Sequence, residues 1–143
     1  MSADLDVYLA AAQPFDWQRN NCAHFAAGWV LLASGRDVPP LWSALMRNTR
    51  AALRHLHRAG GRMAATAAAD EHFGQHLGGL YAARGDVVLL SVDPAASEAG
   101  AHCGMPLGMA WGVCTGGQIA ALGVGGVVFL PLTAESAAWR VWA

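Results

Sequence analysis

The first half of the chain carries apolar residues at helical spacing. Residues 5–12 predict a short helix that Pro14 ends, because proline lacks a backbone donor and clashes with the preceding turn. Residues 22–33 predict the most buried helix, preceded by two asparagines that suit N-caps and closed by Ser34-Gly35. Its apolar positions are Phe25, Ala26, Trp29, Val30 and Ala33.

Three further helical segments follow a turn at Val38-Pro39-Pro40. Residues 43–59 predict an arginine-rich amphipathic helix that ends at Gly60-Gly61. A short helix is expected over about residues 63–68, and residues 70–77 are expected to add another turn or two.

After Gly78-Gly79 the pattern changes to that of strands. Four short β-rich runs, bounded by Gly, Pro or Asp, cover residues 87–92, 107–114, 118–122 and 127–132. Thr115-Gly116-Gly117 predicts a hairpin turn, and residues 139–142 predict a final edge strand. Helices first and an antiparallel sheet of four to five strands second is the α+β pattern.

Length and composition narrow the classes of protein. A chain of 143 residues is expected to form a single domain, residues 1–143, with a real core. Only 13% of the residues are charged, yet no apolar run reaches the roughly 18 residues of a membrane-spanning helix. The first residues lack the pattern of a secretory signal, so we expect synthesis and folding in a cytoplasm.

The charged residues do not favour nucleic acid as a partner. The net charge is -1, and the nine basic residues are all arginine. Helical spacing places several of them close to one stripe, which is either a solvated helix face or a docking surface for a partner. These residues are Arg47, Arg50, Arg54, Arg58 and Arg62.

Cysteine and histidine spacings do not predict a metal or another cofactor. The three cysteines have no CxxC spacing, which argues against a disulfide framework and a structural zinc site. His72 and His76 are four residues apart and are expected to share a helix face, but the carboxylates near them are limited to Asp70 and Glu71. We therefore expect no bound metal.

Cys22 is the candidate for chemistry, because it stands where a loop becomes an apolar helix. Free N–H groups and the positive end of the helix dipole favour a thiolate at such a position. The same position also suits a small buried hydrophobic residue, so the cysteine alone leaves both roles open.

The six tryptophans are expected mostly in the core. Trp139 and Trp142 lie close to the C-terminus and are the best candidates for contact with a partner.

Three segments together resemble the NlpC/P60 branch of the papain-like superfamily: the cysteine that opens a buried helix, Arg84 to Leu90, and Leu107 to Val113. Pro-Phe-x-Trp before Asn-Cys-Ala-His-Phe-Ala-Ala, together with Ala-Trp-Arg-Val near the end, resembles a small family of phage proteins encoded among tail genes. The resemblance covers nearly the whole chain, with a helical insertion at about residues 41–78 that matches loosely.

The resemblance implies a papain-like fold in which Cys22 corresponds to the nucleophile. The histidine slot of that family aligns with Pro106, and the slot of the third polar residue falls near Ala120 or Ala121. Without a base, a thiol near its ordinary pKa is mostly protonated at neutral pH. The sequence therefore argues against a working peptidase.

Two histidines are possible substitutes for the missing base. His102 lies on a loop four residues before the expected slot, whereas His24 stands two residues from Cys22 and points about 200° away on a helix.

Two functions remain. The favoured one is a structural or assembly component of a phage tail tip, located in the virion tail and bound to tail-tip or hub proteins. The alternative is a cysteine hydrolase that cleaves peptidoglycan peptides during genome entry, with Cys22 as nucleophile and His102 as base.

Overall fold

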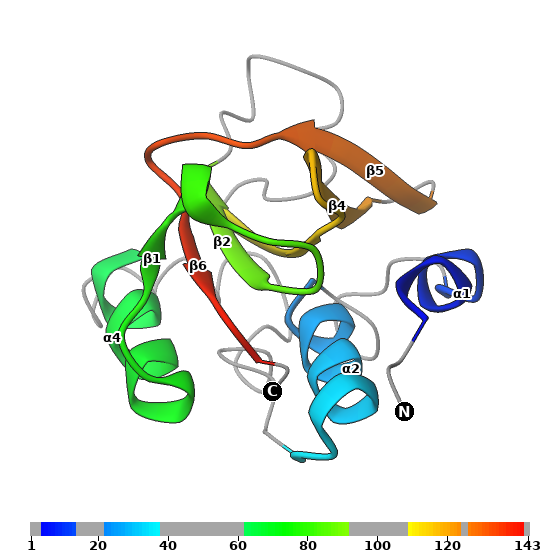
Figure 1. The fold of residues 1–143 in the computed structure, drawn as a ribbon, viewed down its shortest axis with the longest axis horizontal. Coiled ribbons are helices and arrows are strands. Elements are labelled where there is room, and N and C mark those ends of the chain that lie inside the picture. The colour runs from blue at the N-terminus through cyan, green and yellow to red at the C-terminus, as the bar shows by residue number, and fades with distance from the viewer. Residues whose placement is uncertain (1–3, 14–21, 38–61, 92–108, 124–125, 142–143) are drawn as a thin grey trace, which may run out of the picture.

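The computed structural model describes residues 4–13, 22–37, 62–91, 109–123 and 126–141 (Figure 1). The arginine-rich helix expected at residues 43–59 and the whole segment 92–108, which precedes the strand expected from residue 107, lie outside these ranges. So do His102 and Trp142.

Three α-helices and a short 3₁₀ helix are described. They are α1 (Leu5–Ala10), α2 (Cys22–Ser34), α4 (Arg62–Phe73) and η2 (Gly79–Tyr81). Asp4 caps α1, because its carboxylate accepts the backbone N–H of Asp6 at 2.9 Å. The two weak helical segments expected before Gly78 form one helix, α4, which ends where Gly74 adopts a φ of 94°.

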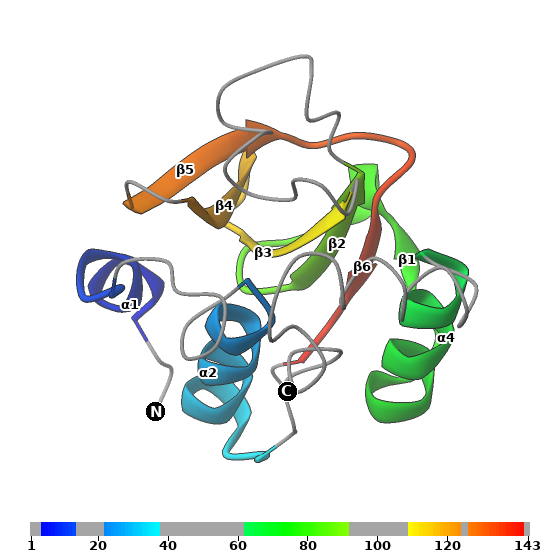
Figure 2. The ribbon, with the colours of Figure 1, turned by 180° about the vertical axis from the view of Figure 1, so that it is seen from behind.

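The strands form one six-stranded antiparallel sheet with the order β1-β6-β2-β3-β4-β5. Figure 2 shows β3 between β2 and β4. The α+β class is confirmed, with more strands than the four to five expected. The bounds are β1 Leu77–Gly78, β2 Val87–Ser91, β3 Met109–Cys114, β4 Gln118–Gly123, β5 Gly126–Pro131 and β6 Ala137–Trp139.

The expectation that the last strand lies at an edge is wrong. β6 pairs with β2 on one side and with β1 on the other, and all three of its residues are buried. The edge position belongs to β1, a two-residue strand that the sequence pattern did not predict. Strand order depends on pairing between distant segments, which a local apolar pattern does not encode.

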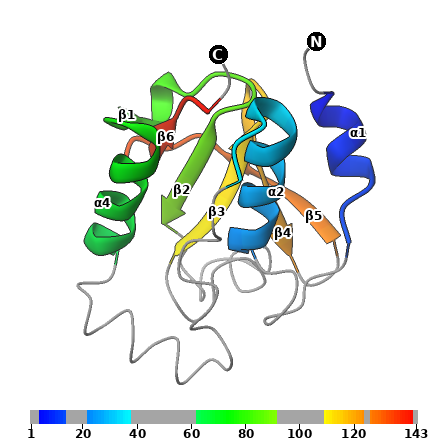
Figure 3. The ribbon, with the colours of Figure 1, turned by 90° about the horizontal axis from the view of Figure 1, so that it is seen from below.

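The core lies between α2 and the central strands. α2 packs against β3 and β4, with α1 on its outer side, and α4 packs against β6 (Figure 3). β3 is buried at all six positions, so both faces of the sheet are covered there. The indole Nε1–H of Trp29 donates to the carbonyl oxygen of Gly85 at 2.8 Å, which ties α2 to the turn before β2.

Tyr8 joins α1 to α2. Its hydroxyl donates to the carbonyl oxygen of Phe25 at 2.6 Å, and its ring packs against the rings of Phe25 and Trp29. Burial raises the pKa of Tyr8 to about 12, so the hydroxyl remains a donor. A Cβ added at Gly28 would lie 2.5 Å from the Tyr8 hydroxyl oxygen, which makes glycine the residue that lets the two helices approach.

Replacing Gly28 with alanine is expected to destabilise the protein by about 1 to 3 kcal/mol, because the new methyl group overlaps the fixed hydroxyl of Tyr8. The Tyr8→Phe variant alone loses the hydrogen bond to Phe25 and about 1 kcal/mol. In the Tyr8→Phe background Gly28→Ala becomes neutral or stabilising, because the ring carbon lies at an ordinary contact distance and alanine favours a helix.

A double-mutant cycle measured by urea unfolding checks this coupling. Additive effects of the two substitutions would contradict the packing described for Tyr8 and Gly28.

Candidate functional site

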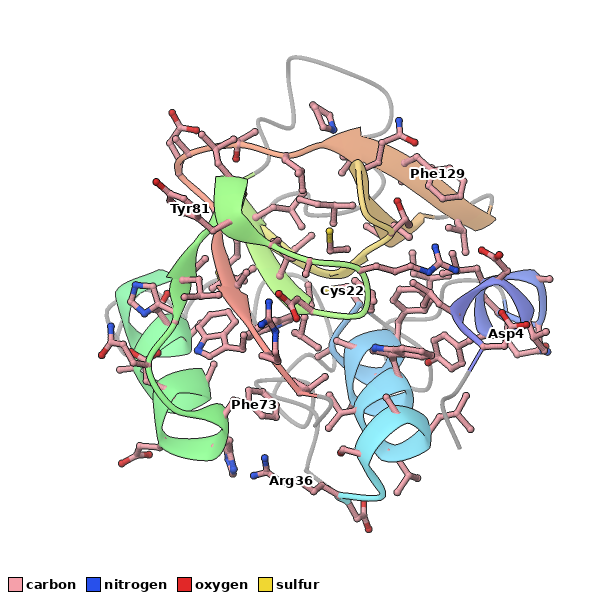
Figure 4. All side chains as sticks on the ribbon, viewed as in Figure 1. Asp4, Cys22, Arg36, Phe73, Tyr81 and Phe129 are labelled. Carbon is pink, nitrogen blue, oxygen red and sulfur yellow. The ribbon has the colours of Figure 1, made fainter. Side chains whose placement is uncertain are left out.

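Cys22 is the first residue of α2 and faces the sheet, with 5% of its surface exposed. Figure 4 shows it at the end of the helix that points toward the strands. Its position at a helix start agrees with the sequence prediction. The sequence left open whether Cys22 is a nucleophile or a small buried residue in the core. Its burial favours the second role.

The backbone of β3 explains what the thiol contacts. The N–H of Cys114 donates to the carbonyl oxygen of Asp86, so the backbone groups of Cys114 face β2. Alternation along the strand then turns the N–H of Trp111 toward β4. The paired register between β3 and β4 runs from Cys114↔Ile119 to Gly112↔Ala121, and Trp111 lies one residue beyond it.

The backbone of Trp111 lies near the Cys22 thiol and favours its thiolate. The sulfur therefore lies at the point where the paired register between β3 and β4 has ended.

Burial raises the pKa of the Cys22 thiol above its ordinary value of 9.0. Hydrogen bonds from the backbone of Trp111, Ala23 and Cys22 itself favour the thiolate, but their combined effect is smaller. The expectation that the helix start favours a thiolate is corrected here. The dipole and free N–H groups are present, but loss of water outweighs them.

Of the residues considered as catalytic partners, His24, Ala120 and Ala121 lie within the described ranges. His24 follows Cys22 on α2 by two residues, and burial lowers the pKa of its imidazole. Ala120 and Ala121 in β4 are fully buried. Methyl groups therefore occupy the positions near which the resemblance places the third polar residue. His102 and Pro106 lie outside the described residues.

Of the residues expected to contact a partner, Trp139 is described and belongs to the core. It is 1% exposed, and its ring packs against that of Trp111 with centroids 5.6 Å apart. The interface expectation is therefore corrected for Trp139, because the pairing of β6 between β1 and β2 buries it. Trp142 lies outside the described residues, as do Arg47, Arg50, Arg54 and Arg58.

A cluster around Asp70, which we call the Asp70 cluster, escaped the sequence analysis. Asp70 Oδ1 accepts the indole N–H of Trp139 at 2.9 Å and the backbone N–H of His76 at 3.1 Å. His76 Nδ1 lies 3.0 Å from the same oxygen. His72 and His76 were expected to share a helix face, but α4 ends at Phe73 and the chain turns His76 back onto Asp70.

Burial pushes the pKa of Asp70 upward, but the hydrogen bonds from Trp139 and His76 and the charge of the imidazole together lower it below 3.8. The cluster links the C-terminal part of α4 to β6. In the sequence, only Asp70 and His76 lie close enough together to suggest this cluster. Its third member, Trp139, is 69 residues from Asp70.

A second carboxylate, Asp86, is completely buried. Its Oδ2 accepts the backbone N–H of Ala83 at 2.9 Å, and its Oδ1 lies 3.3 Å from Nε of Arg140. Arg84 donates to the carbonyl oxygen of Thr115 and also pairs with Asp6 of α1. The Arg-Gly-Asp segment that contributes to the resemblance therefore has a structural role.

Among the described residues, no group of three or more His, Cys, Asp or Glu side chains is arranged to hold a metal ion. In the same residues, no helix has the length and apolar character that a membrane span requires.

A family model described as a domain of unknown function, DUF6950, matches residues 2–141. Searches of curated proteins and of solved structures return no match.

Native Cys22 is expected to react with iodoacetamide at neutral pH at least about a hundredfold more slowly than in the denatured chain, because it is buried and protonated. The rate should still be rising with pH at 9.0, where that of an ordinary thiol begins to level off, because the pKa of the native Cys22 thiol lies above this value. Peptide mapping by mass spectrometry gives the rate for this residue.

The matched control is Leu32→Cys, which places a thiol at an exposed position of the same helix. Labelling of Cys22 as fast as that exposed thiol would contradict the buried, neutral state.

Replacing Asp70 with asparagine is expected to cost about 1 kcal/mol at pH 7, because the charge-assisted hydrogen bonds in the Asp70 cluster weaken. The native pKa is lowered, so the stability from the carboxylate is complete above 3.8 and is lost as the pH falls through the native pKa. Urea unfolding at several pH values should show the difference between the two proteins shrinking below 3.8.

Asp37→Asn, at an exposed position, is the control for a general loss of charge. A difference between wild type and Asp70→Asn that persists unchanged in acid would show that the charge of Asp70 does not stabilise the fold.

Proposed function

We propose that this chain, which belongs to the DUF6950 family of domains of unknown function, is a structural or assembly component of a phage tail tip. In this proposal the domain has a papain-like layout and has lost its catalytic centre. Its partners are tail-tip or hub proteins, and it is made in the host cytoplasm and carried in the virion tail.

The arrangement of α2 against the sheet supports the papain-like layout. A cysteine opens a buried helix, and that helix packs on the strand that the NlpC/P60 resemblance aligns with the histidine-bearing strand. Helices precede an antiparallel sheet along the chain, as that resemblance implies.

The state of Cys22 is the observation that supports a non-catalytic role most strongly. A nucleophile needs access to substrate and a base that removes its proton. The thiol of Cys22 is buried, its pKa is raised by burial, and it lies against the backbone of Trp111.

Exposed apolar side chains support a role in assembly. Leu80 and Tyr81 on η2 are 60% and 77% exposed, and Figure 4 shows Tyr81 at the outside of the fold. Leu77 of β1 is also exposed and precedes them by a few residues. Large apolar side chains gathered on one short segment are typical of a protein contact surface. The assignment to a phage tail itself rests on the sequence motifs.

The Cys22→Ala variant is expected to be incorporated into particles as efficiently as wild type, with a packing cost of about 1 to 2 kcal/mol. Incorporation is measured by mass spectrometry of purified virions, and Cys114→Ala serves as a control because Cys114 is another buried cysteine.

The hydrolase alternative makes the opposite prediction. Purified wild-type protein would release peptides from peptidoglycan, and Cys22→Ala would abolish that release while assembly is preserved. Absence of the wild-type protein from particles and from assembly intermediates would contradict the tail assignment.

A further inference from the structure

β5 is a sheet edge of unusual composition. It forms one end of the strand order, and its six residues, Gly126–Pro131, include no charged side chain. The sequence remains uncharged from Gln118 through Ala134, which covers the whole β4–β5 hairpin. Natural edge strands are usually protected from pairing by charged side chains, by proline, by bulges or by being very short, and β5 has a proline only at its last residue.

The register of the hairpins shows which backbone groups of β5 face outward. The N–H of Thr115 donates to the carbonyl oxygen of Gln118, so the backbone groups of Gln118 face β3. Gln118 lies opposite Pro131, whose backbone therefore faces away from β4. Alternation gives the same outward direction to Phe129 and Val127.

The outward groups form a short row that another strand can pair with. Val127 and Phe129 each present an N–H and a carbonyl oxygen, whereas Pro131 presents only a carbonyl oxygen. The side chain of Phe129 is 52% exposed, and Figure 4 shows it on the outer part of β5. The opposite edge, β1, has only two residues and offers a much shorter row.

We propose that β5 pairs with β5 of a second copy of this chain, antiparallel and about a two-fold axis through Val128. In this register Val127 of one copy lies opposite Phe129 of the other, and the two residues exchange their outward hydrogen bonds. The outward N–H groups of Val127 and Phe129 in both copies then find acceptors. The two six-stranded sheets join into one continuous sheet.

Two features favour a second copy as the occupant. A two-fold axis brings identical residues close together, so a charged strand would repel itself, and β5 has no charge. Each Val127 also meets a Phe129 across the interface, which is a favourable pair of a β-branched and an aromatic side chain.

The register is also selective. A two-fold axis through Phe129 would instead place Val127 opposite Pro131, which has no N–H to donate. Both registers form the same number of hydrogen bonds, but the axis through Val128 leaves only the carbonyl oxygen of Pro131, at the end of β5, without a donor, whereas the axis through Phe129 places the carbonyl oxygen of Val127 against the proline. This inference concerns self-association and does not depend on the proposed role in a phage tail.

Phe129→Pro tests the proposal, because it removes an outward N–H while leaving the bonds between β5 and β4 in place. Phe129→Thr is the matched control, since it also removes the phenyl ring but keeps the N–H. In sedimentation equilibrium the wild type is expected as a dimer that dissociates on dilution. The dissociation constant of the Phe129→Pro dimer should be about tenfold or more higher than that of the Phe129→Thr dimer.

Hydrogen exchange of the wild type gives a second measurement that needs no variant. The amides of Val127 and Phe129 should be protected at high protein concentration and exchange on dilution. The amides of Val128 and Leu130, which face β4, should stay protected at both concentrations.

A wild type that is monomeric at every concentration would overturn the proposal. So would a dimer in which the amides of Val127 and Phe129 exchange as fast as in the monomer, because another surface would then hold the copies together. Equal dissociation constants for Phe129→Pro and Phe129→Thr, with both variants folded, would also overturn it.

Discussion

The Cys22 thiol is buried against the backbone of Trp111, where the start of α2 packs on the sheet. This contact lies on a fully buried strand, at the point where the paired register with β4 has ended. The same contact places the sulfur away from water, which raises its pKa and keeps it neutral. Packing requires the Cys22 sulfur to be buried, whereas nucleophilic attack requires it to be accessible and ionised. In this fold the sulfur is buried and its pKa is raised.

Carboxylates in this protein also serve the fold. Asp86 is buried and connects the turn before β2 to Arg140 near the end of the chain. Asp70 connects α4 to β6 through the indole of Trp139. Sequence motifs that contain these residues are explained by the contacts that the residues make.

The sequence predicted the elements whose pattern is local. Residues 22–33 were identified as a buried helix from apolar spacing, and α2 spans Cys22–Ser34. The strands at 118–122 and 127–132 were found within a residue or two, because glycines and proline mark their ends. The turn after Cys114 closes through Thr115 and Gln118, with Gly116 at a φ of 123°, as its composition indicated.

Features set by distant pairing were not predictable in this way. The central place of β6 and the state of the Cys22 thiol both depend on which segments meet across the sheet. Position at a helix start suggested a thiolate, but the covering strand decided otherwise, because desolvation outweighs the backbone donors. For the same reason Trp139 became a core residue although it stands near the end of the chain.

The closed contact between α2 and β3 also bears on where this domain can meet a partner. When the helix start is sealed against the sheet, recognition has to use groups that the fold leaves outside. On the described residues these include the apolar side chains of η2 and the outward backbone groups of β5. Backbone groups recognise a strand without requiring a particular side chain, and absence of charge lets two identical strands approach. A domain whose thiol serves packing can in this way contribute to an assembly through the edge of its sheet.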